Sequence, residues 1–445
     1  MAKRGGPAPT DADADAPVVR RAPFAVNPAV GERGKQAQRR ILDAALTVFG
    51  EVGYEQCRVG RITEAAGCSR VSFYQYFSSK EDVFRQLSAI VYRELSEAVA
   101  SVGAITPDTA GHDALADWFG RYGAIYDRYE PVYAAFQTAT NRDAELTQGA
   151  RKATSRTLQA FDSHVSGSPL ATDERRSVIR VIAELTIRAN RFRELVEAGD
   201  PPVALSHERL NAALADVVHR ALFGPIAGVN TQATPGKRLF RIEGGQWDAA
   251  EVPDEPGSLR TTVLEAAHRV FLDRGFHAAR IDDIAAEAGV SHGALYRYFR
   301  TKSDLFRVLA AQSADRFNRA FDELGELVLT GSTAATDFRH WVRDYAATCA
   351  DAAAIMRVWA EALARDPKLG SDSAAAIRYS CSRLAKVLAQ RDSGDADAEA
   401  LVMLAMLEAI ATIGATVEQV DIGADAIERS LLLLAPARRS KRRAS

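Results

Sequence analysis

Two short apolar runs separated by a glycine form the most informative pattern in the chain. Ile62, Ala65 and Ala66 recur at helical spacing and predict a short helix with one apolar face. Gly67 stands where a helix end favours a left-handed residue, and Ser69 is a suitable N-cap for a following helix. The pattern therefore predicts two short helices joined by a tight turn.

The second of these helices is expected to have one buried face and one exposed face. Phe73 and Phe77, spaced four residues apart, predict the buried face. A short helix held by its apolar side suits insertion into the DNA major groove when its other side is polar. The positions predicted to face outward are Arg70, Val71, Ser72, Tyr74 and Gln75.

The same pattern occurs twice. Residues 284–299 repeat residues 62–77 at an offset of 222 without a gap, so that Gly289 and Ser291 correspond to Gly67 and Ser69. Helical periodicity also predicts a helix over 36–51 before the first motif and a fourth helix from about 80 to 101 after it.

Both copies, with their flanking helices, share further positions over about 47 residues each. The first copy includes Ile41, Gly53, Tyr54, Ile62, Ala66, Gly67, Ser69, Tyr74, Gln75, Tyr76, Phe77 and Lys80. The second includes Val263, Gly275, Phe276, Ile284, Gly289, Ser291, Gly293, Leu295, Tyr296, Tyr298, Phe299 and Lys302. These residues resemble the DNA-binding domain of TetR-type transcriptional regulators. The resemblance implies an all-α fold with two units, each a three-helix helix-turn-helix domain followed by a helical ligand-binding and dimerisation domain.

Both copies depart from the family pattern at one position. The family usually places Thr or Ser at the start of the second helix, whereas this chain has Arg58 and Arg280. We expect weaker capping there, with a phosphate contact by arginine as the alternative use. Val71 also stands where the second copy has Gly293, which changes the expected geometry of base contacts.

The resemblance implies that double-stranded operator DNA is the partner. Arg70 is the candidate for a bidentate contact to guanine. Tyr76 and Tyr298 have two readings, a phosphate contact or a half-buried core position. The predicted DNA-binding residues are Arg58, Ser69, Arg70, Val71, Ser72, Tyr74, Gln75, Tyr76 and Lys80 in the first copy, and Arg280, Ser291, His292, Gly293, Ala294, Tyr296, Arg297, Tyr298 and Lys302 in the second. Because the two recognition helices differ, we expect an asymmetric operator.

The repeat continues beyond the helix-turn-helix motifs. Trp341 and Tyr345 follow Trp118 and Tyr122 at an offset of 223. An aromatic stripe at helical spacing is usually core, while the resemblance implies a pocket for a small apolar effector. The candidate effector contacts are Trp118, Tyr122, Tyr126, Tyr133 and Phe136 in the first half, and Trp341, Tyr345, Met356 and Trp359 in the second.

The family pairs through the last two helices of each subunit. The corresponding segments are 173–199 and 207–223 in the first half, and 395–418 and 423–435 in the second. An apolar set in the second half fits either an internal core or a four-helix interface between the halves. The chain is therefore expected to form an intramolecular pseudo-dimer or a homodimer. The apolar set is Leu401, Leu404, Met406, Leu407, Ile410 and Ile413.

These observations predict seven segments. Residues 34–101 and 257–322 form the helix-turn-helix domains with their connecting helices, and 102–225 and 323–436 form the C-terminal helical domains. The Gly- and Pro-containing segment 226–256 is a linker, and residues 239–242 within it either add a short strand or dock. The ends are a disordered tail over 1–33 and a basic tail over 437–445.

Composition and charge narrow the function. The net charge is −2, yet residues 33–87 carry nine basic against six acidic residues, and residues 258–309 carry eight against six. Four scattered cysteines and eight dispersed histidines form no recognisable metal, disulfide or catalytic motif. We expect a cytoplasmic protein with no membrane span, no metal, no cofactor and no enzymatic activity.

The sequence therefore predicts a sequence-specific transcriptional regulator. Repression with release by a small molecule is the preferred interpretation, because occupancy of an operator is sufficient to block polymerase. The alternative is an interaction scaffold, or a regulator in which only one helix-turn-helix motif binds DNA.

Overall fold

The computed structural model describes residues 32–140, 143–224, 239–240, 257–327, 367–389 and 394–416, with scattered positions between 336 and 355. For 137–138, 277, 367–370 and 410–416 it describes the backbone alone. Several predictions lie outside these residues: nearly all of the N-terminal tail, most of the linker, Met356, Trp359, the helix at 423–435 and the basic tail.

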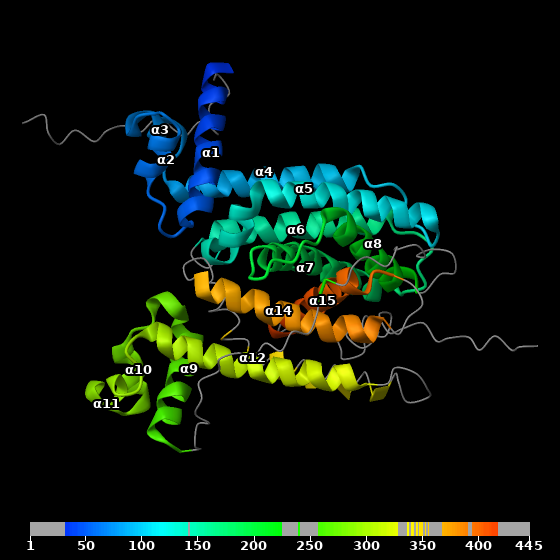
Figure 1. Cartoon of the computed structure of the whole chain (residues 1–445). Helices are drawn as coiled ribbons and strands as arrows, with labels where there is room; N and C mark the ends of the chain where they lie inside the picture. Colours follow the sequence, from blue (N-terminus) through cyan, green and yellow to red (C-terminus); the bar gives the residue numbers. More distant parts are fainter. Residues whose placement is uncertain are drawn as a thin grey trace, which may run out of the picture. The chain divides into compact units, whose positions relative to one another are not determined.

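The first helix-turn-helix domain comprises α1 (Glu32–Val52), α2 (Val59–Ala65) and α3 (Arg70–Tyr76) (Figure 1). Helix α1 ends at Gly53, whose φ of +74° suits a residue without a Cβ. Phe49 and Phe84 pack around Tyr54, with ring centroids 5.3 and 4.8 Å from the Tyr54 ring. This aromatic cluster forms part of the core of the domain.

Four further helices complete the first half. They are the kinked α5 (Thr109–Thr140), α6 (Ala144–His164), α7 (Thr172–Glu197) and α8 (His207–Phe223), all reached through α4 (Lys80–Ala100). The kink of α5 falls at Tyr129, two residues before Pro131, because proline cannot supply the helical hydrogen bond and its ring crowds the preceding turn.

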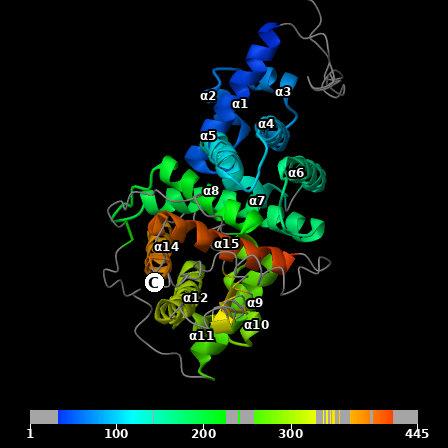
Figure 2. The ribbon, with the colours of Figure 1, turned by 90° about the vertical axis from the view of Figure 1, so that its right-hand side faces the viewer.

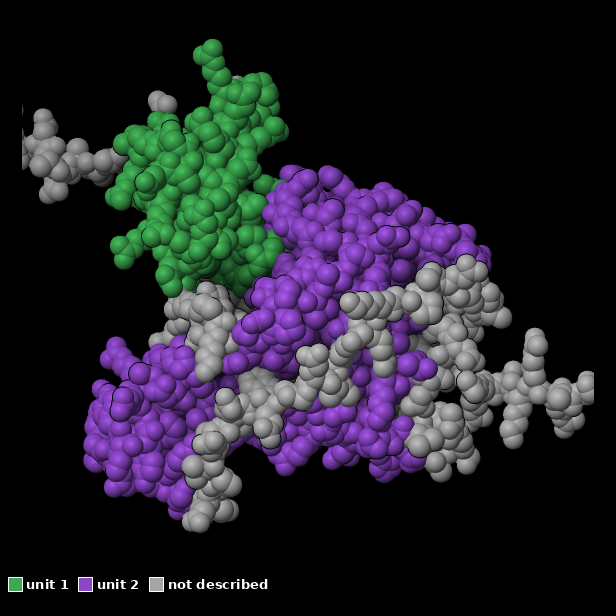
Figure 3. Space-filling view, in the orientation of Figure 1, with its two compact units in different colours: residues 1–90, 130–139 green, residues 91–129, 140–445 purple. Residues whose placement is uncertain are grey.

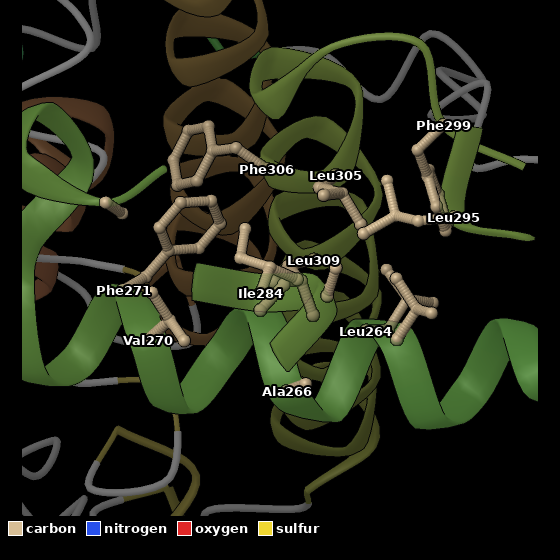
Figure 4. Close-up of a cluster of buried hydrophobic side chains, with 14 of the residues drawn as sticks. Leu264, Ala266, Val270, Phe271, Ile284, Leu295, Phe299, Leu305, Phe306 and Leu309 are labelled. Atoms are coloured by element: carbon tan, nitrogen blue, oxygen red, sulfur yellow. The ribbon is translucent and has the colours of Figure 1, made fainter. Parts of the chain in front are cut away.

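The second half repeats this order. It comprises α9 (Leu259–Ala278), α10 (Ile281–Ala288), α11 (His292–Tyr296), α12 (Lys302–Glu326), α14 (Pro367–Leu388) and α15 (Ala396–Thr416). Helix α9 breaks at Gly275, whose φ of +71° matches that of Gly53 in the first half. A single core holds the second helix-turn-helix domain together; in it Phe271 lies beside Phe306, with ring centroids 6.1 Å apart (Figure 4).

The chain divides into two compact units (Figure 3). The first contains residues 1–90 and 130–139, and the second contains residues 91–129 and 140–445. The first helix-turn-helix domain belongs to the first unit, and the second domain belongs to the second unit with both sets of C-terminal helices. The seven segments predicted from the sequence follow different boundaries and stay predictions.

Within the second unit, the C-terminal helices of the two halves pack on each other. Helix α15 lies against both α7 and α8, and α14 also lies against α7 (Figure 2). The side chains of Leu401, Leu404, Met406 and Leu407 are all buried, whereas those of Ile410 and Ile413 lie outside the description. The two halves of one chain therefore share an interface.

Two residues of the linker are described. The backbone N–H of Leu239 donates to Asp397 at 2.8 Å, and Phe240 is buried. Of the two alternatives for residues 239–242, the described pair docks.

The predicted all-α class is confirmed. Every regular element in the described part of the chain is a helix, and Ile105 forms an isolated bridge with Val165. Among the described helices, none combines the length and apolarity needed to cross a membrane.

Candidate nucleic-acid interface

The first motif has the backbone geometry that the sequence predicts. Gly67 has a φ of +60° and ends α2, after which the Ser69 hydroxyl accepts the N–H of Ser72 at 3.0 Å. Phe73 and Phe77 are fully buried, so α3 is held by its apolar side. Arg70, Val71, Tyr74 and Gln75 are exposed and Ser72 is half-buried.

The second motif uses the same backbone signals on a shorter recognition helix. Gly289 has a φ of +66°, and the Ser291 hydroxyl accepts the N–H of Ala294 at 3.3 Å. Leu295 and Phe299 are buried in the positions of Phe73 and Phe77 (Figure 4). On the outer side, His292, Gly293, Tyr296 and Arg297 are exposed and Ala294 is half-buried.

The structure confirms the weak capping predicted at Arg58 and Arg280. Both occupy the N-cap position, and neither side chain accepts a hydrogen bond there. Asp283 partly compensates in the second copy, because its carboxylate accepts the N–H of Arg280 at 3.0 Å. The first copy has Arg61 at the equivalent position, so this N–H has no such acceptor and the surface gains a positive charge.

Lys80 and Lys302, which are predicted to contact phosphate, bind backbone carbonyls of their own domains. The Lys80 ammonium donates to the carbonyls of Tyr54 and Glu55 at 2.8 and 3.2 Å. Lys302 repeats this with the carbonyls of Phe276 and Ala279 at 2.5 and 2.9 Å. These lysines bind carbonyl groups just past the helix breaks at Gly53 and Gly275, which gives them a structural role. Their phosphate contacts stay predictions.

The tyrosines differ between the copies. Tyr74 and Tyr296 are each 49% exposed, whereas Tyr76 is half-buried. Tyr298 is exposed, and the Arg297 guanidinium donates to its hydroxyl at 3.0 Å and lies 5.1 Å from its ring centroid. Tyr76 therefore fits the half-buried core position, and Tyr298 lies at the surface, where a phosphate contact is open to it.

Charge distinguishes the motifs more strongly than shape does. Residues 58–77 carry three basic residues against one acidic residue, whereas residues 280–299 carry two against three. Among the described residues, no carboxylate forms an ion pair with Arg58, Arg61 or Arg70. In the second motif the acidic residues form three pairs: Arg269 with Glu287 at 2.7 Å, Arg274 with Asp283 at 2.8 Å and His292 with Asp282 at 3.4 Å.

Two pairs of equivalent positions summarise this difference. Arg70 lies over the first turn of α2, where a Cβ at Gly60 would stand 3.0 Å from its guanidinium. In the second copy, His292 replaces Arg70 and Asp282 replaces Gly60. A free guanidinium attracts phosphate or guanine, whereas a histidine beside a carboxylate attracts an anion less.

The sequence interpretation missed Arg61, Asp282, Asp283 and Glu287 as determinants of the surface. All four lie on the helix before the recognition helix, and their charge was a readable signal. What the sequence did not supply was the partner of each charge.

The proposed effector residues are mainly core packing. Trp118 lies 4.9 Å from Phe161 and 5.8 Å from Tyr122 between ring centroids, and Trp341 stacks on Tyr345 at 5.2 Å. Their side chains and that of Tyr126 are buried, while Tyr133 and Phe136 are half-buried.

A surface groove occurs elsewhere in the second unit. It has a volume of about 520 Å³, and none of the predicted effector residues lines it. Its lining combines apolar surface with side chains of both signs of charge. The residues are Arg93, Glu94, Glu97, Ala98, Ser101, Arg121, Ala124 and Ile125. An effector contact by the aromatic residues stays a prediction.

Comparison with known proteins matches both motifs. The model of the bacterial regulatory proteins of the tetR family matches residues 41–87 and again residues 263–309. Both helix-turn-helix domains of this chain match the DNA-binding domain of the TetR family. The chain is a tandem form, because the helix-turn-helix domain of the family occurs twice in it.

Several curated relatives share part of this chain. It is 37% identical over 86 residues to the HTH-type transcriptional activator FasR of Mycolicibacterium smegmatis, covering 19% of this chain and 37% of FasR. It is 39% identical over 57 residues to the repressor KstR2 of the same species, covering 13% and 28%. It is 33% identical over 72 residues to the repressor AcnR of Corynebacterium glutamicum, covering 16% and 38%. The chain thus spans well under half of each relative, and these relatives include both activators and repressors.

Proposed function

We propose that this tandem TetR-family chain binds double-stranded DNA through its helix-turn-helix motifs and regulates transcription. The observation that carries the proposal is the exposed side of α3, where Arg70 and the neighbouring Arg58 and Arg61 form no ion pair with a described carboxylate. A free arginine on a recognition helix supplies base contacts, and free arginines beside it add counterion release.

We further propose that the two motifs read unlike half-sites with unequal strength. The first motif supplies most of the affinity, because its arginines are free. The second motif supplies weaker contacts through Arg280, Tyr296, Arg297 and Tyr298. Packing of α7 and α8 against α14 and α15 supports one chain, rather than two, on each operator.

A second candidate function follows from the acidic residues of α10. With Asp282, Asp283 and Glu287 beside its recognition helix, the second motif is a candidate for a domain that has lost DNA binding. The chain would then recognise a single half-site.

Selection from random duplex DNA tests both candidates. Two unlike half-sites at fixed spacing, protected by one chain as measured by native mass spectrometry, support the first candidate. A single enriched half-site supports the second. Absence of any enriched sequence contradicts DNA recognition by this chain.

The regulatory consequence is also a proposal. Repression remains the preferred outcome, since blocking polymerase needs nothing beyond occupancy, and release by a small apolar molecule is the proposed control. A promoter-reporter assay with and without the intact gene distinguishes repression from activation, because deletion raises expression in one case and lowers it in the other.

A further inference from the structure

Among the described residues, the three ion pairs between the two halves have the same polarity. Arg209 of α8 binds Asp395 through two hydrogen bonds of 2.6 and 2.9 Å. Arg220, also of α8, binds Glu399 of α15 at 2.5 Å. A third pair, Arg188 of α7 with Glu408 of α15, lies at 3.8 Å. In each pair the first half provides the arginine and the second half provides the carboxylate.

These groups are largely removed from water. The side chain of Glu399 is 1% exposed and that of Arg220 is 10% exposed. The Arg209–Asp395 pair is somewhat more accessible, at 27% and 17%. A buried charge that loses its partner is strongly destabilising, so this interface tolerates only a surface of complementary charge.

The interface also has a close steric fit. A Cβ placed on Gly199, just after α7, would lie 2.6 Å from the Cβ of Ala374 on α14. Beside it, Arg378 of α14 donates to the carbonyls of Asp200 and Pro201 at 2.9 and 3.2 Å. Charge and shape therefore both match one half to the other.

The internal repeat indicates what a second copy of the first half would offer instead. Helix α15 corresponds to α7 at an offset of 223 or 224 residues. In either register Glu399 falls on an arginine, Arg176 or Arg175, and Asp395 falls on a residue without charge, Thr172 or Ala171. In a pair of first halves Arg220 would face an arginine and Arg209 would lose its carboxylate. The third acid, Glu408, falls on Leu185 in one register and on Glu184 in the other, so the argument rests on Arg209 and Arg220.

We propose that this interface is specific for unlike halves, so that the partner of the first half is the second half and not a second copy of itself. The charges act against pairing of like halves, since such pairing would bury arginines beside arginines. This inference concerns the pairing of the halves and does not depend on whether the chain binds DNA.

A charge-reversal cycle in the full-length chain tests the proposal. Arg220→Glu and Glu399→Arg, each alone, place like charges together and are expected to lower the midpoint of thermal unfolding by roughly 10 °C. The variant with both substitutions restores opposite charges and is expected to regain at least half of that loss. The wild-type chain is expected to keep the mass of one chain in light scattering across a hundredfold range of concentration.

The same cycle on a more exposed pair covers the case in which a single variant at Arg220 does not fold. Arg209→Glu and Asp395→Arg form that second cycle, with smaller expected shifts. The proposal is overturned if the double variants lose as much as the sum of the single variants in both cycles. It is also overturned if the wild-type chain forms dimers and a charge reversal does not change their stability.

Discussion

The two halves of this chain have the same helix order and the same turn geometry. They differ in charge around the recognition helices and at the interface that they share. Gly53 follows the end of α1 and Gly275 breaks α9, and both have a positive φ. Ser69 and Ser291 cap the recognition helices. The first half adds free arginines around α3, whereas the second half places carboxylates beside α11. At the shared interface the first half again supplies arginines and the second half again supplies acids.

The core and the surface of each helix-turn-helix domain are therefore specified by different residues. Buried positions such as Phe73 and Leu295 keep the helices in place, while exposed positions can change sign without disturbing the fold. Two copies of one domain in this chain therefore present exposed surfaces of different charge.

The largest expected effect concerns the acidic side of the shared interface. Burial raises the pKa of Glu408 from an ordinary value of 4.5 to about 7, and the nearby Arg188 lowers it in part. The native state therefore binds a proton more tightly than the unfolded chain. Between pH 4.5 and about 7 the free energy of unfolding falls as the pH rises, by up to about 3 kcal/mol from this group.

Glu408→Gln sharpens that prediction, because an amide does not titrate. Denaturant unfolding of both chains between pH 5 and 8 is expected to show a wild-type stability that falls relative to the variant. A constant difference between the two chains would mean that Glu408 keeps an ordinary pKa.

The next effect tests the difference between the recognition helices directly. Arg70→Ala is expected to weaken binding to the preferred operator by about 10- to 100-fold, corresponding to about 1–3 kcal/mol for a bidentate base contact. His292→Ala is the matched control and is expected to weaken binding less than about threefold, because the His292 ring already lies beside the Asp282 carboxylate. Fluorescence anisotropy measures both.

A mismatch in the half-site locates the contact. For wild-type protein, the mismatch is expected to lower affinity, and Arg70→Ala removes this difference. Equal losses on matched and mismatched DNA would show that Arg70 does not read a base.

A third prediction concerns the hydrogen bonds from a lysine to backbone carbonyls, which both halves have. Lys80→Met and Lys302→Met each remove an ammonium from two backbone carbonyls, and both are expected to lower the free energy of unfolding by about 1–3 kcal/mol. The salt dependence of DNA affinity is expected to stay unchanged. A slope reduced by about one in either variant would instead restore the phosphate contact predicted from the sequence.

The smallest effect comes from exchanging the residues beside the recognition helices. Gly60→Asp gives the first motif the carboxylate of the second, which would pair with Arg70 and lower DNA affinity by about 3- to 10-fold. Asp282→Asn removes the opposite charge from the second motif and is expected to raise affinity by about 2- to 5-fold. Titration of both variants on one operator checks whether the changes have opposite sign. Changes of the same sign would show that this position acts through folding.

The local parts of the fold were predictable from the sequence. Helix ends, the tight turns and the buried sides of the recognition helices depend on glycine, serine and apolar spacing within a few residues. Those signals act over one or two helical turns, so the pattern of Gly67, Ser69, Phe73 and Phe77 was sufficient. The repeat in sequence likewise identified two copies of one domain.

The tertiary structure decided where long side chains and charges find partners. Lys80 donates to carbonyls about two dozen residues earlier in the chain. Arg209 donates to Asp395, which lies beyond the linker in the sequence. A flexible cation has many partners within its reach, and only the packed helices select one. For this protein the sequence alone therefore determined the elements and the family resemblance. The pairing of charges required the three-dimensional structure, because electrostatic energy depends on distance in space and on burial, neither of which is written locally in the chain.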